Sequence, residues 1–156
     1  MNNLFLITAT LLMGIIFLAG LYERFVNMPK WFSNPPASFA LIREHTPKAR
    51  KIHIPLQILF LISFVIALIQ NWEAGTIRTY MLLSIASFII IIIITVKYFA
   101  KEIIVFTKIP EDAPSDPELI KRAEFWEKWT TVRNVLQLIG FIFLVLALTS
   151  QHLINN

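Results

Sequence analysis

Polar and aromatic side chains recur at helical spacing just before the last apolar run of the chain, in the stretch FWEKWTTVRNVLQLIG. Steps of three, four, four and three residues separate Trp126, Trp129, Arg133, Gln137 and Gly140, so these residues share one face of a helix. Within an apolar bundle, an arginine and an amide on such a face bind polar groups of a ligand or link helices by hydrogen bonds. The alternative is the ordinary membrane interface, where aromatic rings collect and long cationic side chains reach the headgroups.

An internal duplication gives this face a counterpart. An offset of 80 residues aligns LQILFLISFVIAL with LQLIGFIFLVLAL, and it pairs His53 with Arg133 and Gln57 with Gln137. In a pseudo-twofold arrangement the four side chains converge near the bundle axis. We expect both glutamines to face inward, because an amide in contact with lipid is costly. His53 is a candidate base, and a structural or solvated histidine is the competing interpretation.

Glu23 is a further candidate for ligand binding. It lies between Tyr22 and Arg24, one turn before Pro29, where a carboxylate could face a pocket near the end of the first helix. The competing interpretation is local ion pairing with its basic neighbour.

The histidine spacing limits the metal and cofactor chemistry. His45 and His53 are eight residues apart, beyond the i,i+4 spacing of a two-histidine metal site, and the chain has no cysteine, so we predict no metal site. His152 falls on the opposite side of the membrane, which disfavours a haem held by two histidines. We predict no cofactor, and a haem held by His53 alone remains the alternative.

The elements that must position these residues are four apolar stretches, at 4–21, 54–69, 80–96 and 135–149. The chain is 56% hydrophobic and 15% charged, which is more apolar surface than a soluble domain of 156 residues can bury. The first stretch is long enough to cross a bilayer, and the others reach roughly 20 residues with their flanks. Lipid offers no partner to the backbone, so the fold class is an all-α integral membrane protein with four transmembrane helices.

The basic residues predict the orientation. Of the 14 Lys and Arg residues, 13 lie within 24–51 or 97–133, and only Arg78 lies in the turn on the other side. Basic residues stay with the cytoplasm, so both long loops are predicted to be cytoplasmic and the N and C termini to be outside. Because these residues flank helix ends, they indicate contact with membrane lipid and no binding of nucleic acid.

Each cytoplasmic loop is predicted to contain a short interfacial helix. The pattern FxxxP ends the first helix at Pro29 and the third at Pro110, because proline lacks a backbone donor. The amphipathic segments that follow are SFALIREH, with Ser38 as its N-cap, and PELIKRAEFW, with Asp116 as its N-cap.

The duplication also predicts the domain organisation, a single membrane domain of residues 1–156 with repeat one at 1–75 and repeat two at 76–156. Both halves begin on the outer side, so they form parallel two-helix repeats about an axis along the membrane normal. This arrangement disfavours an alternating-access transporter. The absence of a charged residue at central membrane depth disfavours a proton-coupled pump.

The helix pattern and one motif also resemble a known family. The features are four predicted helices, small residues in the first helix, a proline after it, and a W-x-x-W-x-x-x-R motif at the last helix: Gly14, Ala19, Gly20, Pro29, Trp126, Trp129 and Arg133. In these features the chain resembles the bacterial membrane-protein family of unknown function that is grouped with anthrone oxygenases. Its members often carry a histidine directly after the second tryptophan, where this chain has Thr130.

The resemblance implies a multi-pass protein of the bacterial inner (cytoplasmic) membrane that oxidises a polycyclic phenolic ketone to a quinone with O2, without metal or flavin. Such chemistry needs a base and a cationic group that stabilises an enolate. By resemblance Arg133 is that cationic group and Trp126 and Trp129 are aromatic walls, whereas His53 as the base comes from the duplication. Thr130 in place of the histidine weighs against oxygenase activity.

Three functions are therefore consistent with the sequence. The first is a pocket open to the cytoplasmic leaflet that binds an apolar or aromatic small molecule and oxidises it as a cofactor-independent oxygenase. Its catalytic residues would be His53 and Arg133, and its ligand-binding residues Gln57, Gln137, Trp126, Trp129 and Glu23. The second is a non-catalytic protein that assembles with itself or a membrane partner through the small residues of the first helix. The third is a haem-dependent membrane enzyme that uses His53.

Overall fold

The structure of the protein is a computed structural model that describes residues 4–114 and 116–155, and the side chains of these residues up to 153. Every regular element within these residues is helical. In chain order the elements are α1 (Leu4–Tyr22), the π-helical turn η1 (Glu23–Asn27), α2 (Met28–Trp31), α3 (Phe39–Gln70), α4 (Gly75–Ile94), the π-helical turn η2 (Thr95–Phe99), α5 (Ala100–Lys108) and α6 (Pro117–Asn155).

Four continuous helical rods result, because η1 joins α1 to α2 and η2 joins α4 to α5. They are Leu4–Trp31, Phe39–Gln70, Gly75–Lys108 and Pro117–Leu153, and each is long and apolar enough to cross a membrane. The prediction of four candidate spans is confirmed, and it points to a multi-pass integral membrane protein.

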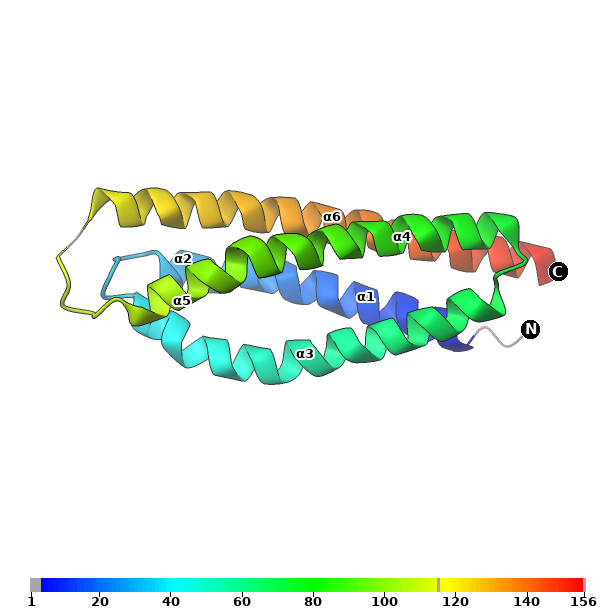
Figure 1. The fold of residues 1–156 in the computed structure, drawn as a ribbon, viewed down its shortest axis with the longest axis horizontal. Helices are drawn as coiled ribbons and strands as arrows, with labels where there is room; N and C mark the ends of the chain where they lie inside the picture. The colour runs from blue at the N-terminus through cyan, green and yellow to red at the C-terminus, as the bar shows by residue number, and fades with distance from the viewer. Residues whose placement is uncertain (1–3, 115, 156) are drawn as a thin grey trace.

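The rods form one elongated bundle (Figure 1). α1 packs against both α3 and α6, and α4 packs along α6. The beginning of α1 and the end of α6 lie at one end of the bundle, which we call the terminal end (Figure 1). The connection 32–38 and the described residues that follow α5, 109–114 and 116, lie at the other end, which we call the loop end (Figure 1). α3 meets α5 at the loop end and bows away from α4 further along the bundle in this view (Figure 1).

Two apolar cores follow one another along the bundle. The first is formed mainly by Leu6, Met13, Phe60, Phe64, Met81, Phe88 and Leu144. The second, the loop-end cluster, consists of Met28, Trp31, Phe39, Ile42, Phe99, Phe106 and Trp126. Its ring pairs include Phe39 with Phe106 and Phe99 with Trp126, both with centroids 5.0 Å apart. Outward-facing aliphatic side chains on every rod remain exposed, as expected when the surrounding solvent is lipid.

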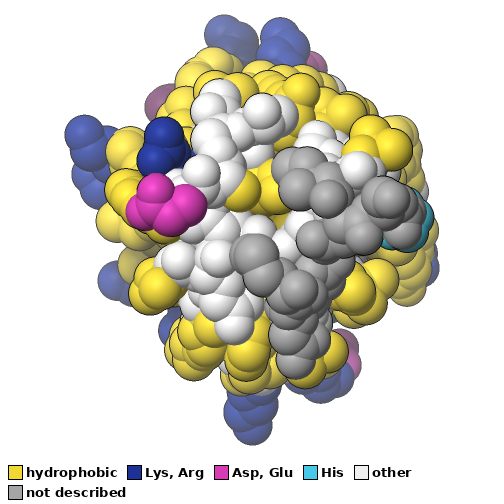
Figure 2. All heavy atoms as spheres, turned by 90° about the vertical axis from the view of Figure 1, so that its right-hand side faces the viewer, with side chains coloured by type: hydrophobic (Ala, Val, Ile, Leu, Met, Phe, Trp, Pro, Cys, Tyr) yellow, Lys and Arg dark blue, Asp and Glu magenta, His cyan; other side chains and the backbone are white. Residues whose placement is uncertain are grey.

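Charge is distributed unevenly between the two ends. Residues 1–22, 52–96 and 134–156 hold only two charged side chains, Glu73 and Arg78. Figure 2 looks onto the terminal end, whose front is largely hydrophobic or uncharged, with most charged side chains further back at the rim. Arg78 caps this end by donating to the carbonyl of Trp72 at 3.0 Å and lying 5.3 Å from its ring.

The prediction of separate interfacial helices is wrong. The segment that begins at Phe39 is the start of α3, which runs through Pro47 and Pro55 to Gln70, and the second segment is the start of α6. Proline removes one donor without breaking a long membrane helix when nearby groups satisfy the freed backbone. Ser38 stands at the N-cap position of α3, but its hydroxyl donates to the Trp31 carbonyl at 2.6 Å instead of capping the helix.

The two FxxxP motifs have different outcomes. Pro110 follows the end of α5, as predicted, and the Asp116 carboxylate accepts the Glu118 N–H at 2.8 Å, as predicted for the α6 cap. Pro29, however, lies inside α2. The preceding π turn, in which the Met28 N–H donates to the Glu23 carbonyl, changes the hydrogen-bond register just before the proline, so the rod continues.

Candidate functional site

Both π turns of the described chain pack against the same segment of α6, residues 126–133. A π turn adds one residue to an α-helix and is frequently found at functional sites. η1 carries Glu23 and Arg24, and η2 carries Tyr98 and Phe99. Polar groups therefore reach this segment from one side and aromatic rings reach it from the other.

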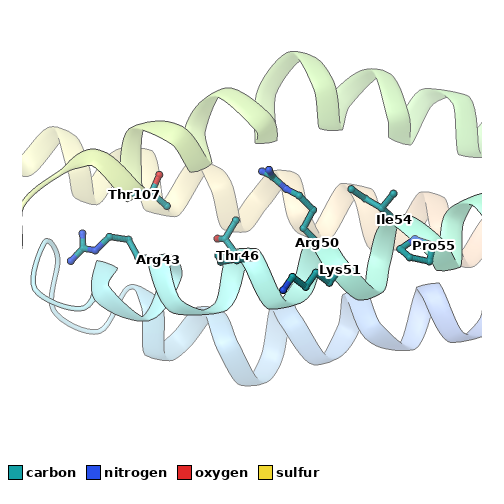
Figure 3. Close-up of a pocket in the computed structure, with 8 residues that line it drawn as sticks. Arg43, Thr46, Arg50, Lys51, Ile54, Pro55 and Thr107 are labelled. Atoms are coloured by element: carbon teal, nitrogen blue, oxygen red, sulfur yellow. The ribbon is translucent and has the colours of Figure 1, made fainter.

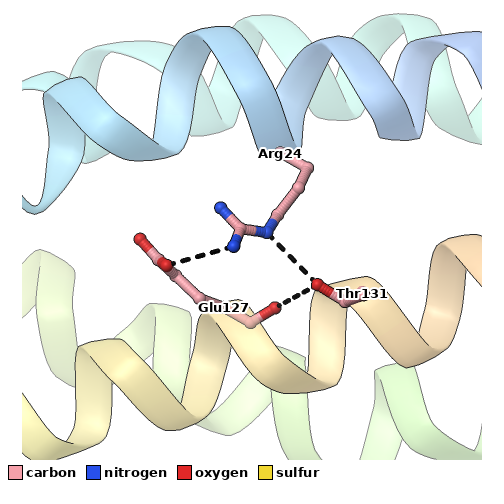
Figure 4. Close-up of polar contacts among 3 residues, drawn as sticks. All are labelled: Arg24, Glu127 and Thr131. Atoms are coloured by element: carbon pink, nitrogen blue, oxygen red, sulfur yellow. Dashed lines mark hydrogen bonds and ion pairs between the residues drawn. The ribbon is translucent and has the colours of Figure 1, made fainter.

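On the η1 side, two ion pairs join the turn to α6. Arg133 donates to the Glu23 carboxylate at 3.0 Å, and the side chains are only 13% and 21% exposed. Arg24 pairs with Glu127 at 3.2 Å and donates to the Thr131 hydroxyl at 3.3 Å (Figure 4). The prediction that Glu23 pairs locally is therefore replaced by a pair that spans 110 positions of sequence.

On the η2 side, an aromatic wall surrounds the same segment. Trp126 is 3% exposed and packs edge-on against Phe99 at 5.0 Å, so it belongs to the loop-end cluster and not to an outer aromatic belt. Trp129 is half-buried and lies 6.2 Å from the Tyr98 ring. The Arg133 guanidinium lies 4.7 Å from the centre of the Phe99 ring, a cation–π contact.

Along this segment α6 buries a row of polar atoms without hydrogen-bond partners, which we call the α6 polar stripe. Its residues fall at helical spacing on one face and are Trp126, Thr130, Arg133, Asn134 and Gln137. The unpartnered atoms are Trp126 Nε1, Thr130 Oγ1, Arg133 Nε, Asn134 Oδ1 and Gln137 Oε1. A buried polar atom without a partner costs about 1–3 kcal/mol, so this row is where water or the polar groups of a ligand would be most stabilised.

Gly20 on α1 lets the two helices meet closely beside this stripe. Asn134 donates from Nδ2 to the Gly20 carbonyl at 3.1 Å. A Cβ at Gly20 would lie 2.6 Å from both the Asn134 Oδ1 and the Gln137 Oε1 atoms. Only glycine leaves room for both amides, so this small residue serves packing within the chain.

A groove between α1 and α3 reaches the same ion pair from outside; we call it the α1–α3 groove. It has a volume of about 660 Å³ and is lined by Ile15, Leu18, Tyr22, Glu23, His45, Lys48, His53 and Leu56, among others. Apolar side chains line the part towards the middle of the bundle, and ionisable side chains line the part towards the loop end. Glu23 thus joins the groove to Arg133 and the α6 polar stripe.

The structure brings together part of the predicted site. Arg133 and Gln137 both belong to the α6 polar stripe, and Glu23 contacts Arg133 directly. His53 lies instead in the α1–α3 groove, and α1 stands between the rods that carry it and Arg133. Gln57 is half-buried on α3, and its side chain has no hydrogen bond to any described residue.

Thr130 and Asn134 are buried on the inner face of α6, although neither was predicted there. The spacing of four, four and three residues from Trp126 through Thr130 and Asn134 to Gln137 was the available signal. It matches the buried face of α6 better than the row through Trp129 and Arg133, which lies at the edge of that face.

The histidines of the groove are too far apart to share a metal ion. His45 and His53 lie on one continuous helix, about 12 Å apart along its axis at 1.5 Å per residue. His45 packs its ring against Trp31 at 5.1 Å. Among the described residues, no three His, Asp or Glu side chains gather in a metal-binding group.

Comparison of the chain with protein-family models, with curated proteins and with solved structures finds no match.

Proposed function

We propose that the protein is a multi-pass membrane protein whose α1–α3 groove binds an apolar or aromatic small molecule that carries a polar substituent. The observation that supports this most directly is the position of Glu23. Its largely buried carboxylate lines the groove and forms an ion pair with Arg133. Pockets for small molecules combine mostly apolar walls with a few placed polar groups, and their volumes are about 300–1,000 Å³. The groove has both properties.

We further propose that the loop end faces the cytoplasm and that both termini are outside. The 13 Lys and Arg residues within 24–51 and 97–133 support this orientation, because basic residues are retained on the cytoplasmic side. The groove then opens towards the cytoplasmic leaflet, and a ligand can enter from the lipid without crossing water. By the family resemblance the membrane is the bacterial inner membrane.

Oxidation of the ligand is the catalytic form of this proposal. The balanced reaction converts an activated CH2 group and O2 into a carbonyl group and water. His53 in the groove would accept the proton of the activated carbon, while Glu23 orients a phenolic hydroxyl as acceptor of its hydrogen bond. Arg133 does not line the groove, so it positions Glu23 and does not touch the ligand.

The experiment is binding and turnover of 1,8-dihydroxyanthrone by the purified full chain in lipid nanodiscs. We expect His53→Ala and Glu23→Gln each to weaken binding about tenfold. Each variant loses one charge-assisted hydrogen bond to the ligand, and a loss of about 1.4 kcal/mol in binding free energy raises the dissociation constant tenfold. Lys101→Gln, an exposed site outside the groove, is the matched control and should bind like the wild type. Equal binding by all four proteins would disprove the groove as the site, and binding without O2 consumption would disprove the oxidation alone.

Two other functions remain alternatives with their own tests. A Soret absorption band in the purified protein would support a single-histidine haem at His53 in place of the oxygenase. Assembly through the small residues of α1 finds less support, because Gly20 is buried against α6 and a Cβ at Gly14 would lie 3.1 Å from Phe141. A homo-oligomer would have to use another surface, and cross-linking in membranes would detect it.

We also propose that the single domain of residues 1–156 arose by duplication, with repeats at 1–75 and 76–156. The Gln151 amide donates to the Asn71 Oδ1 atom at 2.7 Å, and these two buried residues are 80 positions apart, the offset of the duplication. Residues related by a pseudo-twofold axis meet each other only at that axis, so this contact supports the proposal.

A further inference from the structure

A second groove, between α3 and α5, has different chemistry; we call it the α3–α5 groove. Its volume is about 810 Å³, and its lining includes Arg43, Thr46, Arg50, Lys51, Ile54 and Thr107 (Figure 3). The ionisable residues of this lining are all cations. The groove lies in the loop-end half of the bundle and begins where α3 and α5 are in contact (Figures 1 and 3).

Two of the three cations are available for an external anion. Arg43 already donates to the Ile109 carbonyl at 2.9 Å and pairs with Glu111. Arg50 and Lys51 are exposed, and neither pairs with an acidic residue of the described chain. In Figure 3 the Arg50 side chain extends from α3 across the groove.

The groove also offers an acceptor for a hydroxyl group. The Thr107 hydroxyl donates to the Ile103 carbonyl at 2.7 Å, which leaves its oxygen free to accept. Cations beside a hydroxyl oxygen that can accept suit a phosphodiester that carries hydroxyl groups.

An exposed apolar track leads away from the cations along α3. Ile54, Ile58, Ile62 and Val65 follow one another at steps of four, four and three residues on one helix face, and each is about half exposed. The track runs from the groove towards the middle of the bundle, the direction in which an acyl chain would extend from a headgroup at the loop end. A soluble phosphate has no acyl chain and would not contact this surface.

We propose that the α3–α5 groove binds an anionic phospholipid, with its phosphate held by Arg50 and Lys51 and one acyl chain lying along the apolar track. Basic pockets between transmembrane helices recognise anionic headgroups in this way. The occupant differs from the ligand proposed for the α1–α3 groove, so each site can fail its test without affecting the other.

The test compares lipid binding by the wild type with that of Arg50→Gln/Lys51→Gln. The purified full chain in mixed micelles is titrated with phosphatidylglycerol or with phosphatidylcholine of the same acyl chains, and bound lipid is counted by native mass spectrometry. We expect the wild type to prefer phosphatidylglycerol. The double variant should bind phosphatidylglycerol about 30-fold more weakly, because each basic residue contributes about 1 kcal/mol to the attraction of an anionic lipid. Arg50→Lys, which keeps the charge, should retain most of the preference.

The matched control is Lys101→Gln/Lys121→Gln, which removes the same charge from exposed positions outside the groove and should bind like the wild type. An equal loss in both double variants would show diffuse attraction to the basic surface and would overturn the site. Equal binding of both lipids by the wild type would overturn it as well. If glycerol 1-phosphate competes as strongly as the lipid, the groove binds a soluble phosphate and the lipid assignment is wrong.

Discussion

The ion pair between Glu23 and Arg133 should contribute far more to stability than any ion pair on the surface. Removing one partner of a fully buried pair costs about 3–5 kcal/mol, whereas an exposed pair contributes about 0.2–1 kcal/mol. The two side chains are 21% and 13% exposed, so this pair lies between the two cases. Arg133→Met also removes the cation–π contact with Phe99, so we expect it to lower the free energy of unfolding by about 2–4 kcal/mol.

A double-mutant cycle isolates the pair itself. Glu23→Gln and Arg133→Met, alone and together, are unfolded reversibly by SDS in mixed micelles, and the transition is followed by far-ultraviolet circular dichroism. We expect a coupling energy of about 1.5–3 kcal/mol, the contribution of a hydrogen bond to a charged group. The internal control is Lys48→Met, because the Lys48–Glu44 pair is 71% and 69% exposed and solvent screens it, so its loss should hardly change the stability.

Two results would refute this reasoning. If Arg133→Met destabilises the protein no more than Lys48→Met, the pair does not hold η1 against α6. If the coupling energy is below about 0.5 kcal/mol while Arg133→Met is strongly destabilising, the arginine acts through its packing on Phe99 and not through Glu23.

Three further substitutions test the packing at this site and at the terminal end in the same unfolding assay. Gly20→Ala should cost about 1–3 kcal/mol, because its methyl group would press on two amide oxygens of α6 at 2.6 Å, whereas Gly75→Ala, with open space around it, should be neutral or stabilising. Trp126→Ala should lower the free energy of unfolding by about 3–5 kcal/mol, because the ring is buried. Phe125→Ala, at a half-exposed position, is the control. If both variants have equally small effects, Trp126 is not buried. Gln151→Ala should lower the free energy of unfolding by about 1–3 kcal/mol, because it leaves the buried Asn71 Oδ1 atom without its donor. An unchanged stability would argue against that hydrogen bond.

Hydropathy predicts the four rods well because a membrane helix must pair its whole backbone internally, whatever its partners are. Local rules also succeed where the chain leaves the helix, as at Pro110 and at the Asp116 cap. The same rule fails at Pro29, and Pro47 and Pro55 likewise lie inside a helix. A proline ends a helix only where a loop is the more stable alternative, and the composition around a proline does not reveal this.

The candidate site was predicted only in part because apolar periodicity does not specify which helices are neighbours. The predicted duplication would place His53 opposite Arg133, but α1 packs between the two rods and carries Glu23 to the arginine instead. The partner of Arg133 lies 110 positions away in the sequence, and no local spacing predicts it. Asn134 was missed for a related reason: its partner is a backbone carbonyl, that of Gly20, and a carbonyl has no sequence signature.

The two π turns also explain how one helix can keep the same face inward through both cores of the bundle. Gly20 and Met28 are buried and eight residues apart, as are Ile91 and Phe99. Eight residues of ideal α-helix turn through about 800°, which would rotate the second residue about 80° away from the face of the first. A π turn takes up one extra residue, so the eight residues turn only as far as seven residues of ideal α-helix, about 700°. The second residue therefore points in nearly the same direction as the first. Deleting a single residue from η1 or η2 would therefore turn the loop-end half of that rod away from the bundle, while the half nearer the termini kept its packing.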